Sequence, residues 1–189
     1  MAALTTIGTI LSRGHVSGSL AYWGRCGVHK SYPDFPKLRA LSDYSGAPRD
    51  VLQRMFADDR HMRVTQEGDG TVRMIEDDVP TDLLDVKIRH ISFASGPMSH
   101  GANMALIQIL ALPEVEAFKK AHNIGPPEEN AFIYPGAAGN ENTAIVSGDL
   151  QNVTVSQALD YVLKTFPGFW LYENCRTEGG GRTVYFNFF

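Results

Sequence analysis

The sequence predicts a single α+β domain, in which a small mixed or antiparallel sheet is packed by two to four helices. The clearest evidence lies in residues 149–189, where a helix-period segment is followed by two strand-period segments with glycines between them. Residues 47–76 show the same order of signals. With 189 residues, of which 43% are hydrophobic, the chain is long enough to bury one core.

The C-terminal stretch predicts a helix, a strand, a turn and a second strand. Ser156 is a candidate N-cap, because its hydroxyl can accept a free amide hydrogen of the first turn. The apolar residues that follow at helical spacing are Ala158, Leu159, Val162, Leu163 and Phe166. Pro167-Gly168 ends this helix. Residues 169–172 and 183–189 are β-prone, and the glycines of 178–181 predict the turn between them.

The first half of the chain predicts fewer elements. Residues 1–19, rich in Gly, Ser and Thr, are expected to form a flexible arm before a domain at 20–189. Pro48 fits the first turn of a helix over 48–56. The alternation in 62–67 and 72–75, with Gly68-Asp69-Gly70 between, predicts a hairpin.

The middle of the chain predicts one strand followed by a helical insertion. Residues 86–93 alternate in polarity and predict a strand. Within an insertion at 94–142, residues 103–112 and 113–120 have helical spacing. Residues 143–147 predict a strand leading into the C-terminal unit.

Two patterns connect the halves and resemble a known family. Helix plus hairpin occurs at 47–76 and again at 156–188, which indicates either an internal repeat or a coincidence of common elements. The sequence NVTVSQALD at 152–160 is similar to the helix start "nVtleeALd" of the short N-terminal domain shared by secretins and TonB-dependent transducers. GAPRDVL at 46–52 and MRV at 62–64 look like that family's first helix and following strand. The resemblance covers residues 45–76 and 143–189, without a secretin or transporter barrel.

The resemblance implies a small exported module, periplasmic or secreted, that binds another protein and catalyses nothing. The start of the chain has no clear signal peptide, so a cytoplasmic location is the alternative. Cys26 and Cys175, the two cysteines, could form a disulfide in an oxidising compartment or be separate thiols.

Composition argues against several partners. The net charge of −4 disfavours a general nucleic-acid binder, which needs clustered Lys and Arg. The sequence has no apolar run of about 18 residues, so no transmembrane helix is expected. Phosphate-loop and dinucleotide-binding glycine patterns are also missing, and no cofactor or metal is predicted.

No catalytic constellation is evident, so the sequence predicts a protein that is not an enzyme. If it is an enzyme, its site must be assembled from scattered residues, of which the first candidates are His90, His100, Asp58 and Glu76. The aromatic strands instead indicate a partner-binding face. The candidate residues are Trp170, Tyr172, Tyr185, Asn187 and Phe189.

The alternative for these strands is burial on both sides beneath the helices of 104–120. Three functions therefore stay open. The first is a non-enzymatic interaction module or assembly subunit of an exported bacterial system. The second is a small intracellular binding or immunity-like protein, and the third is the enzyme with a scattered site.

Overall fold

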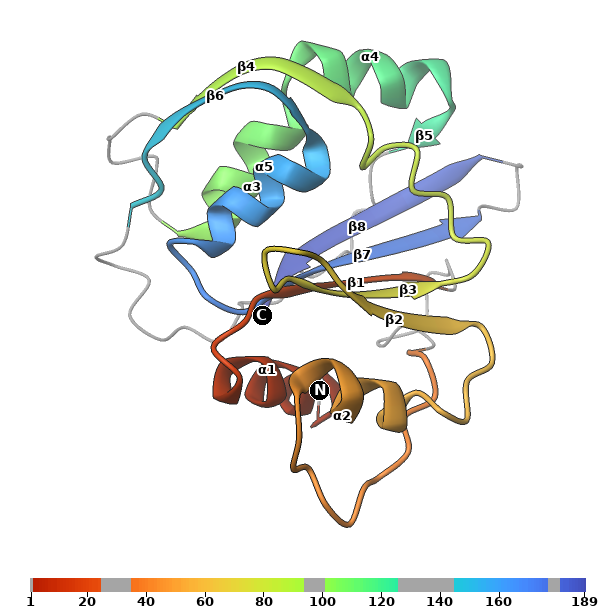
Figure 1. Cartoon of the computed structure of the whole chain (residues 1–189). Helices are drawn as coiled ribbons and strands as arrows, with labels where there is room; N and C mark the ends of the chain where they lie inside the picture. Colours follow the sequence, from red (N-terminus) through yellow and green to blue (C-terminus); the bar gives the residue numbers. More distant parts are fainter. Residues whose placement is uncertain (1, 25–34, 94–100, 126–144, 177–180) are drawn as a thin grey trace.

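The computed structural model describes residues 2–24, 35–93, 101–125, 145–176 and 181–189. It has four layers (Figure 1): a two-stranded ribbon, a layer of helices, a six-stranded sheet and a second layer of helices. The sheet is mixed, and helices pack on both faces, so the predicted α+β class is confirmed.

The N-terminal strand β1 lies in the middle of the main sheet. The strands are β1 (Gly18–Trp23), β2 (Met62–Gln66), β3 (Val72–Glu76), β5 (Ile124–Gly125), β7 (Phe169–Arg176) and β8 (Arg182–Phe188), in the spatial order β2-β3-β1-β7-β8-β5. β1 pairs in parallel with both β3 and β7. The hairpins β2–β3 and β7–β8 are antiparallel, as predicted from their turns. The carboxyl ends of β1, β3 and β7 therefore meet at one edge.

One face of the sheet is covered by α1 (Ala2–Arg13) and α2 (Pro48–Met55), which lie below the sheet in Figure 1. The prediction of a flexible arm at residues 1–19 is wrong for the described part of it. Ile7 and Leu11 lie one helical turn apart and are fully buried against β1 and β3 residues such as Leu20 and Val72. The small polar residues that suggested an arm occupy the other side of an amphipathic helix.

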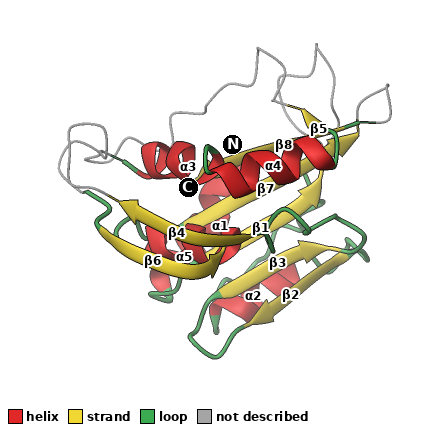
Figure 2. Ribbon diagram, turned by 90° about the horizontal axis from the view of Figure 1, so that it is seen from above, coloured by secondary structure: helices red, strands yellow, loops and turns green. Residues whose placement is uncertain are grey.

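The opposite face is covered by α3 (Ala102–Leu110) and α5 (Val155–Leu163), which pack against each other. A ribbon of β4 (Lys87–Phe93) and β6 (Gly148–Thr154) lies over them, with Ile88 and Ile91 directed into the same core. Figure 2, seen from above, shows β4 and β6 side by side, with α4 (Pro113–Ala121) near β5.

Two predictions in this region are corrected by the structure. The N-cap of α5 is Thr154, not Ser156: the Thr154 Oγ1 accepts from the Gln157 amide at 3.2 Å, and the Gln157 Oε1 accepts from the Thr154 amide at 2.8 Å. Of the strand expected at 143–147, residues 143–144 lie outside the described residues, and the strand that the structure describes here is β6, which begins at Gly148. The sequence 152–156 suits either conformation, and pairing with β4 decides in favour of the strand as far as Thr154.

The two helix-plus-hairpin units, α2-β2-β3 and α5-β7-β8, have the same element order and flank β1 in one sheet. Their helices pack on opposite faces of it. Among the described residues, no helix combines the length and apolar character needed to cross a membrane.

Candidate binding pocket at the carboxyl ends of the parallel strands

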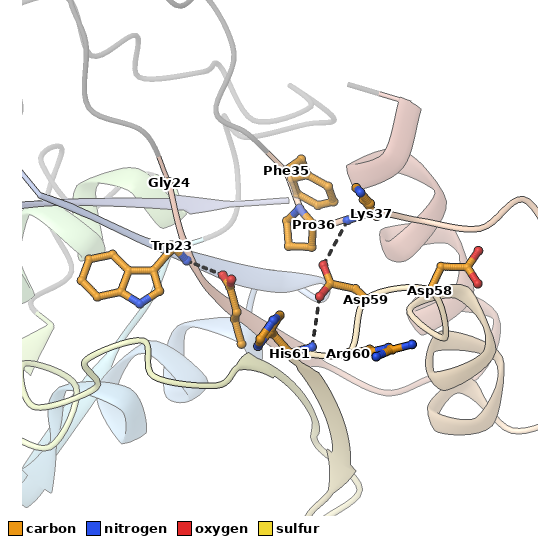
Figure 3. Close-up of a pocket in the computed structure, with 10 residues that line it drawn as sticks. Trp23, Gly24, Phe35, Pro36, Lys37, Asp58, Asp59, Arg60 and His61 are labelled. Carbon is orange, nitrogen blue, oxygen red and sulfur yellow. Dashed lines mark hydrogen bonds between the residues drawn. The ribbon is translucent and has the colours of Figure 1, made fainter.

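A pocket of about 560 Å³ lies beyond the carboxyl ends of β1 and β3 (Figure 3). Its lining consists of Trp23, Gly24, Phe35, Pro36, Lys37, Asp58, Asp59, Arg60, His61 and Glu76. In sheets with parallel strands, ligands bind outside these ends, where loops replace the ladder. The volume is also that of ordinary small-ligand pockets, about 300–1,000 Å³.

Asp59 fixes the two loops that form one wall. Its Oδ2 accepts a hydrogen bond from the Lys37 amide at 3.3 Å, and its Oδ1 accepts one from the His61 amide at 3.1 Å. Figure 3 shows both bonds converging on this carboxylate. Asp58, next to it, forms an exposed ion pair with Arg39 at 3.2 Å. Both carboxylates therefore have partners within the chain, and that of Asp59 ties two loops together.

Glu76 closes the end of the β1–β3 ladder. The Trp23 amide donates to Glu76 Oε2 at 2.6 Å, in place of the next backbone acceptor. The Trp23 indole nitrogen donates to the Asp78 carbonyl at 3.0 Å, and the Arg176 guanidinium lies 5.0 Å from the centre of the Trp23 ring. These contacts fix the end of β1 where it enters the pocket.

A row of two acids and two tyrosines crosses the sheet, and one of the four, Glu76, lines the pocket. Tyr22 is opposite Glu173, and Glu173 is opposite Tyr185. Tyr22 and Glu76 lie one residue beyond the Ala21–Ile75 pair of the β1–β3 ladder. The order across the four strands is therefore Glu76, Tyr22, Glu173, Tyr185. Two strand spacings place the backbones of the two glutamates about 10 Å apart.

Glu173 is the buried acid of this row, since only 8% of it is exposed. Its Oε2 accepts a hydrogen bond from the Tyr22 hydroxyl at 3.1 Å. Burial raises the pKa of Glu173 to about 7, and the hydrogen bond from Tyr22 offsets only part of that increase. A substantial fraction of Glu173 is therefore protonated near neutral pH.

Gly24 connects Glu173 with the pocket. Gly24 lines the pocket, and a Cβ added to it would lie 1.7 Å from the Glu173 Oε1. Any side chain at position 24 would occupy the space beside this oxygen. Glycine at this position therefore permits the close approach of the Glu173 side chain.

The candidate aromatic residues for partner binding lie mostly in the core. Trp170 and Tyr172 are buried, and their polar atoms donate to the Asp160 carboxylate at 2.8 Å and to the Pro80 carbonyl at 3.0 Å. Asn187 is 7% exposed.

Tyr185 and Phe189 are partly buried, and Phe189 stacks on Phe169. All of β7 except Arg176 is buried, and no residue of β8 is fully exposed. The described parts of these strands are therefore largely buried on both sides, which is the alternative, and Tyr185, Phe186 and Phe189 are only partly covered.

Of the four residues named for a scattered enzyme site, the structure brings two together. Asp58 and Glu76 both line the pocket. His90 lies on the exposed side of β4, where its Nε2 is 3.3 Å from the Asp149 Oδ1. His100 lies outside the described residues.

Cys175 is fully buried in β7 and takes part in a disulfide. Cys26, the other cysteine of the chain, lies outside the described residues. Their pairing stays a prediction.

Glu173, Tyr22, Asp59 and Gly24 were not predicted as site residues. Only Glu173 carries a sequence signal, as the single charged residue in the run 169–175, which is otherwise suited to burial. The other three depend on the order of strands in the sheet, which the local pattern does not encode. In the described part of the chain, no group of three or more His, Cys, Asp or Glu side chains is arranged to hold a metal ion.

In comparisons with known proteins, the chain matches no protein-family model, no curated protein and no solved structure. The resemblance to the short N-terminal domain of secretins and TonB-dependent transducers therefore stays a prediction.

Proposed function

We propose that the chain is a non-enzymatic protein-binding module of an exported system, and that a side chain of its partner enters the pocket between Trp23, Gly24 and Glu76. The observation that carries this proposal is the state of the three lining carboxylates. Glu76, Asp59 and Asp58 are held by the Trp23 amide, two loop amides and Arg39. Each carboxylate keeps further acceptor sites, but the contacts that it makes within the chain hold the walls of the cavity in place.

The export part of the proposal is supported by the disulfide at Cys175, because disulfides persist in oxidising compartments such as the periplasm. The pocket also has a mixed lining suited to recognition. Phe35 and Pro36 supply apolar surface, while Lys37, Arg60 and His61 are exposed around it. Such a rim of polar groups around a partly apolar centre is the usual anatomy of a protein interface.

Acid–base catalysis is the second candidate function, and the row of glutamates favours it. A buried glutamic acid with a raised pKa and a second carboxylate on the same face resemble the acid and base of a hydrolytic site. The hydrogen bond from the Trp23 amide to Glu76 argues against this assignment, because one of the two carboxylate oxygens is held by the backbone.

Position-specific photo-crosslinking in extract of the native source tests the proposal. A benzophenone amino acid is placed at Arg60 on the pocket rim, at Gln151 on β6, or at Lys120 on α4; all three residues are exposed. We expect one dominant protein adduct from position 60 and none of it from position 120. Excess unlabelled protein should abolish the adduct.

The same adduct formed equally from all three positions would contradict a pocket-centred interface. An adduct formed only from position 151 would move the interface to the β4–β6 ribbon. Turnover of a small substrate that is lost in E173Q, with no protein adduct, would favour the second candidate function.

A further inference from the structure

Glu173 is a buried carboxyl group with one oxygen left unused. Oε2 accepts from the Tyr22 hydroxyl, and Oε1 has no hydrogen-bond partner among the described residues. Although the residue is more than nine-tenths buried, no Lys or Arg of the described chain pairs with it. A buried carboxyl group without a cation is costly to ionise, and this cost is the physical cause of its raised pKa.

Glu173 is not itself one of the residues that line the pocket, but its unused oxygen lies against Gly24, which is. Oε1 lies beside the Cα of Gly24, where a side chain would otherwise block it. Glu76, which also lines the pocket, contacts the preceding residue through the Trp23 amide. Two acids therefore flank the dipeptide Trp23-Gly24. Glu76 is half-buried and lies beside Trp23, and Glu173 is buried and lies beside Gly24.

We propose that Glu173 is the anchor of the pocket and binds the ammonium group of a partner lysine side chain. This inference rests on the proposed function, since it specifies which group of the partner enters the pocket. The occupant pairs with Oε1 while its methylene stem lies against the apolar surface of Phe35 and Pro36.

Several features favour lysine over arginine. A guanidinium binds a carboxylate best through two parallel hydrogen bonds, which need both oxygens free. Tyr22 already donates to Oε2, so a guanidinium would have to share that oxygen with Tyr22, whereas an ammonium needs only Oε1. A thin, flexible stem also reaches a deep oxygen more easily than a planar fork does.

The other charges near the pocket set the strength of binding. The carboxylates of Glu76 and Asp59 attract a cation, while Lys37 and Arg60 on the rim repel it. Asp58 is neutralised by Arg39, and Tyr185 faces Glu173 from β8. Because the rim cations are exposed, salt screens their repulsion more than it screens the contact with the buried Glu173.

Binding of an ammonium must release a proton. The carboxyl group is partly protonated near neutral pH, whereas the paired form is a carboxylate. Affinity therefore rises with pH through the pKa of Glu173 and levels off above it. With a pKa of about 7, the affinity should increase about tenfold between pH 6 and pH 8.

The test uses Nα-acetyl-lysine methylamide as the probe, titrated into the full chain by calorimetry at pH 6, 7 and 8. We expect saturable binding that strengthens about tenfold across this range, with proton release seen as a buffer-dependent heat. The arginine analogue should bind more weakly. A ¹³C carboxyl titration should show the pKa of Glu173 falling when the lysine analogue is present.

Two variants make the result specific. E173Q keeps the shape but cannot hold a charge, so it should lose saturable binding and the pH dependence together. E116Q carries the same substitution at an exposed site on α4 and should bind as the wild type does. Equal or tighter binding of the arginine analogue, or unchanged lysine binding in E173Q, would overturn the inference. So would a lack of binding to the wild type at pH 8.

The test of the lysine anchor and the test of the protein-binding role can fail independently. A crosslink at position 60 that persists in E173Q, with no lysine binding, would refute the lysine anchor and leave the interface in place. Lysine binding without any position-60 adduct would refute the protein-binding role and not the chemistry of the pocket.

Discussion

Arg73 on β3 makes a two-pronged hydrogen-bonded ion pair with Asp160 on α5, with Nη1–Oδ1 and Nη2–Oδ2 distances of 2.8 and 2.6 Å. The Trp170 indole donates to the same carboxylate, and the Arg73 guanidinium lies 5.7 Å from the centre of the Trp170 ring. Burial opposes the charge of Arg73, but its hydrogen bonds to Asp160 and Glu67 outweigh this and raise its pKa. The contact joins the two helix-plus-hairpin units.

Asp160→Asn should lower the free energy of unfolding by about 2–3 kcal/mol, because it leaves a mostly buried guanidinium without its main partner. Chemical denaturation followed by circular dichroism measures the change. Asp50→Asn, at an exposed ion pair on α2, is the matched control and should cost about 0.5 kcal/mol or less. Equal effects of the two substitutions would show that the inter-unit contact contributes little.

Stability should depend on pH through Glu173. Its pKa rises from 4.5 to about 7 on folding, so the folded state binds more protons between these values. The resulting stabilisation is complete below pH 4.5 and is lost as the pH rises through 7, by about 3 kcal/mol in total.

Denaturation curves at several pH values check this dependence. The free energy of unfolding of E173Q should gain about 3 kcal/mol relative to wild type between pH 4.5 and pH 8. E116Q should follow the wild type across the whole range. If the difference between E173Q and wild type does not change with pH, Glu173 is not protonated in the folded protein.

The pairing of Cys26 with Cys175 is expected to appear in intact-mass analysis. Protein prepared without reductant should be lighter than the reduced form by two hydrogens, and alkylation should add no label before unfolding. Because Cys175 is fully buried, reduction should require denaturant. Loss of the bond should cost about 2–4 kcal/mol. Labelling of both thiols in the native, oxidised preparation would contradict the pairing.

A charge at Ala158 in α5 should be poorly tolerated, since this residue is fully buried in the core between the helix and the sheet. Ala158→Asp should cost about 4 kcal/mol or more and abolish cooperative unfolding. Ala117→Asp, at an exposed position of α4, should leave the thermal melt close to that of the wild type. A normal melt for Ala158→Asp would be incompatible with the packing of α5.

Both helix-plus-hairpin units could be predicted from the sequence because their signals are local. The turn at Gly68-Asp69-Gly70, Pro48 in the first turn of α2 and the apolar stripe of α5 all act within a few residues. The prediction is wrong for residues 2–13 because it gave more weight to their Thr, Ser and Gly content than to the helical spacing of Ile7 and Leu11. In the structure these two residues are buried against the sheet, and this packing stabilises the helix.

The pocket depends on pairings between distant strands. Tyr22 and Glu173 are 151 positions apart and meet only because β1 inserts beside β7. Glu76 and Asp58 were named from the sequence, but as members of a set that included His90, which lies on the ribbon. Residue type alone could suggest an unusual acid at Glu173, and the strand order was needed to identify its neighbours.

The position of β1 has a consequence for assembly of the fold. In the sheet, β1 is the strand that joins the β2–β3 hairpin to β7, and β7 has β1 as its second neighbour beside β8. A polypeptide lacking residues 1–24 would thus lack the strand that connects β3 to β7, and the two parts of the sheet would each have an unpaired edge. A synthetic peptide of those residues, supplied separately, should dock there and restore the missing order, as in fragment complementation.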